Sequence, residues 1–210
     1  MTNLEIKKAL KNALCTNHSG KMEGMVSLST SVKLNPYCAE RAKIPGSICA
    51  KCYAERQLSY QHTTAAKYER NTKLLTSEVY PVECFPEILE TIGRFEAFGE
   101  LFNTVQLENY FNMCLKNPDV DFALWTKNVF ILANGRRKGL QKPKNLTIIQ
   151  SSMFINKAVR KTDPWVDKTF TVWDKEHAKS VNINCGGKKC KKCQICYHDN
   201  GIDEINEILK

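Results

Sequence analysis

Stretches with the pattern of β-strands alternate with stretches with the pattern of helices through the middle of the chain. The strand-like TIGRFEAF precedes the helix-like QLENYFNMCLKN, and the strand-like DFALWTKN precedes the helix-like VFILANGRRKG. Three further stretches are strand-like: NLTIIQSS, TFTVWD and VNINC. Because strands that alternate with helices form βαβ units, the sequence predicts an α/β fold with a mostly parallel sheet.

The first part of the chain adds elements to this sheet. The first dozen residues have the spacing of a helix, MVSLSTSV from Met25 has the pattern of a strand, and Thr63 to Ser77 has the pattern of a helix, with a cysteine-bearing loop before it. Five or six strands are too few to close an eight-stranded barrel. We therefore expect a partial, open β/α barrel with cysteine-rich, cluster-binding loops near both ends.

The length of 210 residues fits a single domain. We expect an N-terminal helix and lead-in over 1–24, the β/α core over 25–182 and a cysteine-rich segment over 183–210. The apolar runs are too short to span a bilayer. The N-terminus has no apolar segment of the kind found in secretory signals, so the expected location is cytoplasmic.

Seven of the ten cysteines form two groups. The N-terminal trio is Cys38, Cys49 and Cys52, and the C-terminal quartet is Cys185, Cys190, Cys193 and Cys196. Disulfides belong to oxidising compartments, so tight groups in a cytoplasmic protein predict metal instead. The three isolated cysteines, Cys15, Cys84 and Cys114, are expected to be small buried hydrophobic residues.

Consecutive C-x2-C steps in the quartet are a ferredoxin-type arrangement, whereas structural zinc sites use separated pairs. The first interpretation is therefore one or two [4Fe–4S] clusters, with zinc as the alternative. Four lysines lie among the quartet cysteines. They would offset the negative charge of a thiolate-ligated cluster and raise its reduction potential. In one variant, both groups share a single cluster.

The CAKCYA stretch, Cys49 to Ala54, resembles the phage and mobile-element family called gene product 88, which is radical S-adenosylmethionine-like. Matching elements are NPYCAERAKIPGSIC upstream, GRFEAFGELFN, DFALWTKN and NLTIIQSS in the middle, and CKKCQIC near the C-terminus. The resemblance covers roughly Met25 to Tyr197 and most of its support comes from the cysteine motifs. It implies an iron–sulfur site more than a particular reaction.

The resemblance also implies a radical S-adenosylmethionine-type fold, in which three cysteines leave one iron open for the methionine end of that cofactor. This chain departs from the usual C-x3-C-x2-C motif, because ten residues separate Cys38 from Cys49. It also has no Gly-Gly-Glu-Pro-like segment on the second strand, where GRFEAFGE is the nearest substitute. The fold could therefore be kept while the radical chemistry is changed or lost.

Several predicted strands end in polar residues. The carboxyl ends of parallel strands form the ligand site of α/β folds and barrels. The candidates for catalysis are Arg94, Glu96, Lys127, Gln150 and Asp174. Ser152 and Tyr53 are the candidates for cofactor binding.

Three functions fit these features. The first is a radical S-adenosylmethionine-like oxidoreductase or lyase, acting on an unidentified small-molecule or macromolecular substrate. The second is an electron-transfer or redox-sensing cluster protein. The third is a zinc-stapled protein that binds nucleic acid through its net charge of +9. No nucleic-acid-binding signature accompanies that charge, and basic residues outside the quartet are interspersed with acidic ones.

Overall fold

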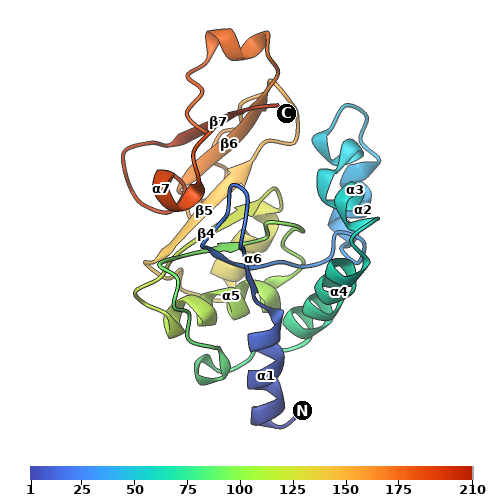
Figure 1. The fold of residues 1–210 in the computed structure, drawn as a ribbon, viewed down its shortest axis with the longest axis vertical. Coiled ribbons are helices and arrows are strands. Elements are labelled where there is room, and N and C mark those ends of the chain that lie inside the picture. The colour runs from blue at the N-terminus through green and yellow to red at the C-terminus, as the bar shows by residue number, and fades with distance from the viewer. Residues whose placement is uncertain (210) are drawn as a thin grey trace.

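The computed structural model describes residues 1–209, which form one seven-stranded sheet with helices packed against it (Figure 1). The strands lie side by side in the order of the sequence. They are β1 (Cys15–Thr16), β2 (Val26–Leu28), β3 (Ile92–Phe95), β4 (Asp121–Thr126), β5 (Leu146–Ser151), β6 (Lys168–Trp173) and β7 (Glu204–Ile208).

The sheet is parallel from β2 to β7, and only β1 is antiparallel to its neighbour. Parallel neighbours in sequence order need crossover connections. Those between β2 and β5 carry helices that pack on one face of the sheet, whereas the connection from β6 to β7 carries the quartet cysteines over the other face. β1 and β7 are the two edges, so the sheet is not closed. The predicted α/β class and the open, mostly parallel sheet are confirmed, with seven strands in place of five or six.

The helices follow the predicted order, with additional short ones around the cysteines. They are α1 (Asn3–Ala13), α2 (Pro36–Ala42), α3 (Tyr53–Leu58), α4 (His62–Ser77), α5 (Thr104–Lys116), α6 (Val129–Arg137) and α7 (Cys190–Cys193), with 3-10 turns η1 (Ile48–Lys51), η2 (Val82–Cys84) and η3 (His177–Ser180). Among residues 1–209, no helix has the length and apolar character needed to cross a membrane.

The larger hydrophobic core lies between the sheet and the helices α1, α4, α5 and α6. Phe95 of β3 stacks on Tyr110 of α5, with ring centroids 4.3 Å apart, and on Phe122 of β4 at 4.9 Å. Gly93 makes this packing possible, because a Cβ atom there would lie 2.6 Å from the Phe122 ring.

The opposite face of the sheet forms a second core. Successive residues of a strand point to opposite faces, so Ile92, Ala123 and Ile149 point away from the helices and pack with Cys196 and Tyr197. The cysteine-rich C-terminal segment therefore covers the face that the helices leave open.

Two predicted elements were wrong. VNINC is not a strand, and the last strand is β7, which pairs in parallel with β6. The stretch before Cys185 instead bonds to β7 from the side, because the Cys185 amide donates to the Asn206 carbonyl at 3.0 Å and the Asn184 side chain accepts from the Asn206 amide at 2.9 Å.

The stretch predicted as a cysteine-bearing loop, NPYCAERAKIPGSICAKCYA, contains α2, η1 and the start of α3. Asn35 caps α2 by accepting from the Tyr37 amide, and Pro36 follows at the first helical position. Asparagine followed by proline is therefore the signal that marks this helix start in the sequence.

Candidate metal centres

The N-terminal trio lies on three short elements at the carboxyl ends of the parallel strands. Cys38 is on α2, Cys49 is on η1, and Cys52 precedes α3. Ser47 caps η1 by accepting from the Ala50 amide at 3.1 Å. The side-chain caps of α2 and η1 fix the backbone that carries Cys38 and Cys49.

Contacts to the strand ends fix these short elements to the sheet. The Tyr37 hydroxyl donates to the Lys127 carbonyl at 2.9 Å, just after β4. The Ile48 amide donates to the Met153 carbonyl at 2.9 Å, just after β5, and the Cys49 and Met153 sulfur atoms are 3.7 Å apart. The trio therefore lies at the sheet edge where ligand sites of parallel α/β folds are found.

The surroundings of the trio disfavour free thiolates. Burial raises the pKa of the Cys38 thiol well above its usual range, and the Glu100 carboxylate adds to the effect. Burial also raises the pKa of Cys49, whereas the Lys127 ammonium acts in the opposite direction. In the metal-free chain these thiols hold their protons, which a bound metal would have to displace.

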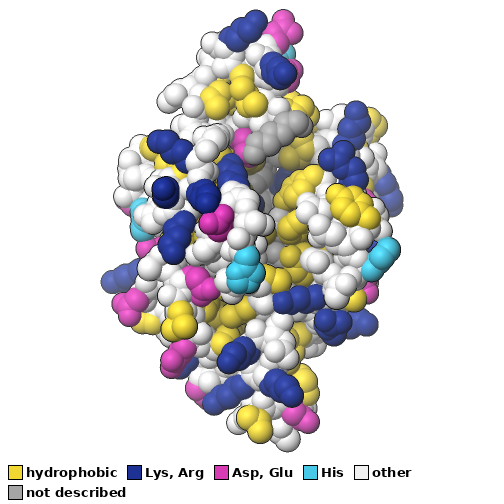
Figure 2. Space-filling view, in the orientation of Figure 1, with side chains coloured by type: hydrophobic (Ala, Val, Ile, Leu, Met, Phe, Trp, Pro, Cys, Tyr) yellow, Lys and Arg dark blue, Asp and Glu magenta, His cyan; other side chains and the backbone are white. Residues whose placement is uncertain are grey.

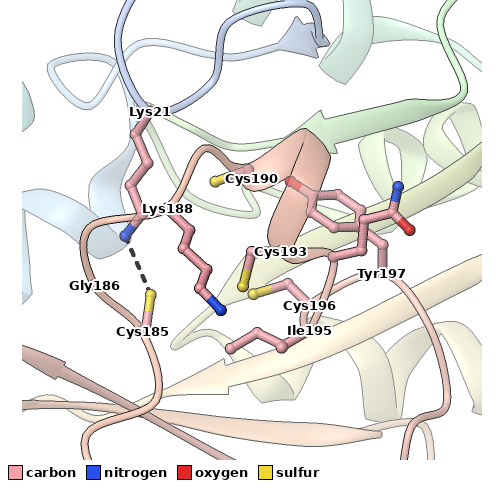
Figure 3. Close-up of a pocket in the computed structure, with 10 residues that line it drawn as sticks. Lys21, Cys185, Gly186, Lys188, Cys190, Cys193, Ile195, Cys196 and Tyr197 are labelled. Atoms are coloured by element: carbon pink, nitrogen blue, oxygen red, sulfur yellow. Dashed lines mark hydrogen bonds between the residues drawn. The ribbon is translucent and has the colours of Figure 1, made fainter.

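The C-terminal quartet surrounds a small cavity on the sheet face opposite the helices (Figure 3). Cys190 and Cys193 are the first and last residues of α7. Gln194 ends that helix in the left-handed conformation, with φ of 55°, and this turns the chain so that Cys196 also lines the cavity. The Cys190 amide donates to the Lys21 carbonyl at 2.8 Å, which attaches α7 to the loop between β1 and β2.

Positive charge surrounds the quartet. The Lys21 ammonium lies 3.1 Å from the Cys185 sulfur and 2.7 Å from a Glu207 carboxylate oxygen. Figure 3 shows Lys21 reaching Cys185 and Lys188 extending across the cavity. Figure 2 shows further Lys and Arg side chains gathered around α7. Cations in this position favour thiolates and any anionic group that the thiolates hold.

Burial nevertheless dominates the titration of the quartet. It raises the pKa of Cys196 to about 12, although the Arg94 guanidinium opposes the shift. Burial likewise raises the pKa of Cys185 and Cys190, against the charge of Lys21. Burial therefore disfavours the thiolate form of these three cysteines in the metal-free chain.

Four cysteine sulfur atoms suit a metal that prefers thiolates, but the cavity that they line is small. The cavity between the quartet cysteines has a volume of about 20 Å³, room for roughly one water molecule. Within residues 1–209, no three His, Cys, Asp or Glu side chains are placed to hold one metal ion. All-sulfur ligand sets select zinc or iron–sulfur clusters. To bind zinc or an iron–sulfur cluster, the 185–197 segment would have to open as the thiols lose their protons.

Buried polar atoms without partners also favour a bound group near both sets of cysteines. Three side-chain atoms within residues 1–209 are buried with no hydrogen-bond partner: Arg41 Nε, Arg94 Nε and the Tyr197 hydroxyl. Arg41 is on α2 with Cys38, and Tyr197 lines the quartet cavity. Such unpartnered buried atoms are rare in folded proteins, and a bound ligand that would accept or donate there is one explanation for them.

The predicted polar site residues separate into two locations. Lys127 lies beside the trio, and the Tyr53 hydroxyl donates to the Ala97 carbonyl just after β3. Arg94 instead faces the quartet. Glu96 is close enough to Cys38 to raise the pKa of its thiol, but its carboxylate accepts from Thr30 and Tyr110 inside the protein.

The remaining predicted residues hold loops in place. The Gln150 side chain accepts from the Thr162 amide at 3.0 Å. The Ser152 hydroxyl lies 2.6 Å from the Lys157 carbonyl. Asp174 is partly exposed and accepts from Asn156 and from the His177 amide, which keeps its pKa well below the usual range. These hydrogen bonds join the three side chains to loop residues and not to a cysteine of either group.

Sequence reasoning missed several neighbours of the two groups. Arg41 and Met153 lie beside the trio, and Lys21 and Tyr197 lie beside the quartet. Arg41 and Tyr197 are each within three residues of a cysteine, which is a usable signal. Lys21 is 164 positions from Cys185, and no local pattern points to it.

The two groups are separate sites. The short helices α2 and α3 lie well apart from α7 in Figure 1. The charged side chains that act on the trio are Glu96, Glu100, Lys127 and Arg41. Those that act on the quartet are Lys21, Glu207 and Arg94. This separation argues against one cluster shared by both groups.

Comparisons of the chain with protein families, with curated proteins and with solved structures found no match. The resemblance to the gene product 88 family therefore stays a prediction. The location and the nucleic-acid partner stay predictions as well.

Proposed function

We propose that the protein is an iron–sulfur protein in which the N-terminal trio holds a [4Fe–4S] cluster with one open iron and the C-terminal quartet holds a second, fully ligated cluster. One observation carries the proposal: the three trio cysteines lie on short elements that are fixed to the carboxyl ends of a parallel sheet. Ligand sites of α/β folds and barrels form at this edge.

The trio supplies three ligands, so one iron would be free to bind a small chelating molecule. A [4Fe–4S] cluster supplies one-electron chemistry, and the methionine end of S-adenosylmethionine is the ligand suggested by the family resemblance. Lys127 and Arg41 would offset the negative charge of such a complex, since both lower the pKa of Cys49. The reaction class that fits is oxidoreductase or lyase chemistry on an unidentified substrate.

Cys15 is the alternative source of a fourth ligand for the trio. It packs with Cys38 and Cys52 against the same apolar residues around Val32. Its thiol faces Tyr68, whose pKa is raised chiefly by burial and further by Cys15. Cys15 is partly buried and not fully buried as the sequence predicted. We expect it to act as a hydrophobic packing residue, and it provides a matched control for the trio.

The quartet would serve as the structural partner of this site. Its four cysteines leave no iron open, and its backbone is bonded both to the loop before β2 and to β7. The metal would lie where the two ends of the chain meet, because its ligands come from the C-terminal segment and Lys21, which bonds to Cys185, comes from the N-terminal part.

Purification without oxygen followed by iron, sulfide and zinc analysis tests the proposal. We expect a brown protein with about eight irons and matching sulfide, reduced by about half in Cys49→Ala. The matched variant Cys15→Ala should keep the full content. A colourless protein that holds stoichiometric zinc after iron-supplemented expression would refute the proposal.

Ligand addition tests the open iron. S-adenosylmethionine should change the electron paramagnetic resonance spectrum of the reduced wild type and of Cys15→Ala, but not that of Cys49→Ala. An unchanged spectrum, together with one cluster lost equally by substitutions in both groups, would instead establish a structural or electron-transfer role.

A further inference from the structure

The three unpartnered buried atoms share one property, which is that each belongs to a side chain beside one of the cysteine groups. The guanidinium of Arg94 acts on Cys190 and Cys196 of the quartet. The guanidinium of Arg41 acts on Cys49 of the trio. Tyr197 is only 3% exposed and lines the quartet cavity, and in Figure 3 its ring reaches toward Cys190.

Both arginines are also held in the same way. The Arg94 guanidinium carbon lies 3.9 Å from the centroid of the Trp125 ring, and that of Arg41 lies 4.8 Å from the centroid of the Tyr37 ring. Trp125 in turn contacts Tyr197 edge-on, with centroids 6.2 Å apart. Stacking on a ring fixes the plane of a guanidinium. Arg41 also bonds to the Tyr37 hydroxyl, but the Nε–H group of each arginine has no partner.

We propose that Arg94 and Arg41 are matching positioning residues, each donating a hydrogen bond and a positive charge to the thiolate-ligated centre of its own cysteine group, with Tyr197 as a second donor to the quartet centre. The inference rests on the proposed function, because it requires that the two groups hold metal. It assigns to these residues control of the reduction potential of each centre separately.

Charge balance explains why such residues would be needed. Each ligating thiolate brings a negative charge, and reduction adds one electron, taken from a reductant such as dithionite, to a centre that is already anionic. A fixed guanidinium in a poorly solvated site stabilises the reduced form more than the oxidised form. Tyr197 contributes a neutral hydrogen bond, so its effect has the same sign and is smaller.

The test is a redox titration of the whole, anaerobically purified protein with dithionite, followed by electron paramagnetic resonance. In Arg94→Gln, the ratio of reduced to oxidised quartet centre at a fixed potential should fall about tenfold, which corresponds to about 59 mV for a one-electron couple. Arg41→Gln should lower the potential of the trio centre and leave the quartet centre unchanged. Tyr197→Phe should move only the quartet centre, by less than Arg94→Gln.

Two variants serve as controls. Tyr80→Phe removes another buried hydroxyl, which donates to the Leu74 carbonyl at 3.1 Å on the helix side, and should move neither potential. Lys192→Gln removes an exposed charge inside the quartet segment. It should shift the quartet potential much less than Arg94→Gln, because water screens the charge.

The outcomes separate this inference from the proposed function. If the wild type holds iron but Arg94→Gln and Lys192→Gln shift the quartet potential equally, the inference is overturned and the proposed function stands. A single transition moved by both arginine variants would overturn the assignment of one arginine to each centre. If the wild type holds zinc, the proposed function fails, and the inference then requires faster zinc release to a chelator in Arg94→Gln than in Tyr80→Phe. A wild type without metal would overturn both.

Discussion

The trio and the quartet differ in how the protein holds them. Side-chain caps and strand-end contacts position the trio: Asn35 and Ser47 cap its helices, and Tyr37 reaches the end of β4. The quartet is attached through backbone bonds from Cys185 and Cys190 to distant segments of the chain. The trio is thus part of the ligand-binding edge of the sheet, while the quartet joins the two ends of the protein.

The charges beside the two groups also differ. A carboxylate lies beside each group, Glu100 at the trio and Glu207 at the quartet, but the Lys21 ammonium lies only 3.1 Å from a quartet thiol, Cys185. A cation this close to a thiolate stabilises it. A metal centre at the trio should therefore be the more easily lost and the more reactive, and one at the quartet the more firmly held.

Loss of a quartet ligand should have the largest effect on stability. Metal binding is coupled to folding, and the quartet segment bonds to both the β1–β2 loop and β7. We therefore expect Cys193→Ala to reduce the free energy of unfolding by more than about 4 kcal/mol. Cys49→Ala should cost less stability while it removes the open site. Anaerobic urea unfolding and limited proteolysis of both ends measure the difference.

A cysteine far from both groups provides the control for this comparison. Cys114 is fully buried on α5, on the helix side of the sheet. Cys114→Ala should cost about 1 kcal/mol, as expected for a small cavity, and should keep all the iron. Equal losses of stability in the Cys114, Cys49 and Cys193 variants would show that neither group holds a structural metal.

Substitution of Gly99 should damage the trio side alone. Gly99 has φ of 106°, and an added Cβ atom would lie 2.6 Å from the Thr30 carbonyl oxygen and would also overlap the Glu96 carboxylate. We expect Gly99→Ala to cost about 4 kcal/mol and to lower the iron content of the trio first.

Gly139 is the matched control for Gly99. It also has positive φ, of 81°, but nothing lies within 4 Å of an added Cβ atom. Gly139→Ala should cost only about 1 kcal/mol for its backbone conformation. Iron loss from the quartet in Gly99→Ala at the same rate as from the trio would contradict the separation of the two sites.

The pH dependence of stability should report on the trio side as well. Burial raises the pKa of Glu96 to about 8 from an ordinary value of 4.5, against hydrogen bonds from Tyr110 and Thr30. Between those two pH values the folded chain keeps a proton that the unfolded chain has lost. The stabilisation is therefore complete below about pH 4.5 and is lost as the pH rises to about 8.

Glu96→Gln isolates this contribution, because its side chain does not titrate. One pKa unit corresponds to about 1.4 kcal/mol, so the wild type should lose a few kcal/mol relative to the variant between pH 4.5 and 8. Urea unfolding of both proteins across this range provides the measurement. A difference that does not change with pH would mean that the Glu96 carboxyl titrates normally in the folded protein.

The alternation of patterns was sufficient to predict most of the sheet. The pattern failed to predict the last strand, and the failure has a physical cause. β7 has the sequence EINEI and lies at the edge of the sheet. Polar residues are tolerated there because one side of the strand has no neighbouring strand. VNINC has better strand residues, yet its backbone bonds to the side of β7. Local propensity could not distinguish which of the two stretches would join β6.

Cysteine spacing predicted the two groups but not their surroundings. Arg94 and Glu96, two residues apart, were predicted to share one site, as side chains with a period of two do on a strand. The strand ends at Phe95, and Glu96 has φ of 53°. This backbone turn directs Glu96 to the helix side and leaves Arg94 on the quartet side, and no sequence pattern indicates it.

Lys21 offers the smallest but most specific test of the comparison. Burial opposes its charge, yet hydrogen bonds with Glu207 and Cys185 keep the pKa of its ammonium above the usual range. The Lys21 side chain is 32% exposed and that of Glu207 is 21% exposed, so solvent weakens the pair and Lys21→Met should cost only about 1 kcal/mol.

The exposed Lys189–Glu23 pair is the control, and Lys189→Met should cost less than about 0.5 kcal/mol. Because Lys21 also touches Cys185, its loss should speed metal release from the quartet and leave the trio unchanged. Equal release rates from the quartet in the two lysine variants would mean that scattered surface charge, and not this one contact, stabilises the quartet centre.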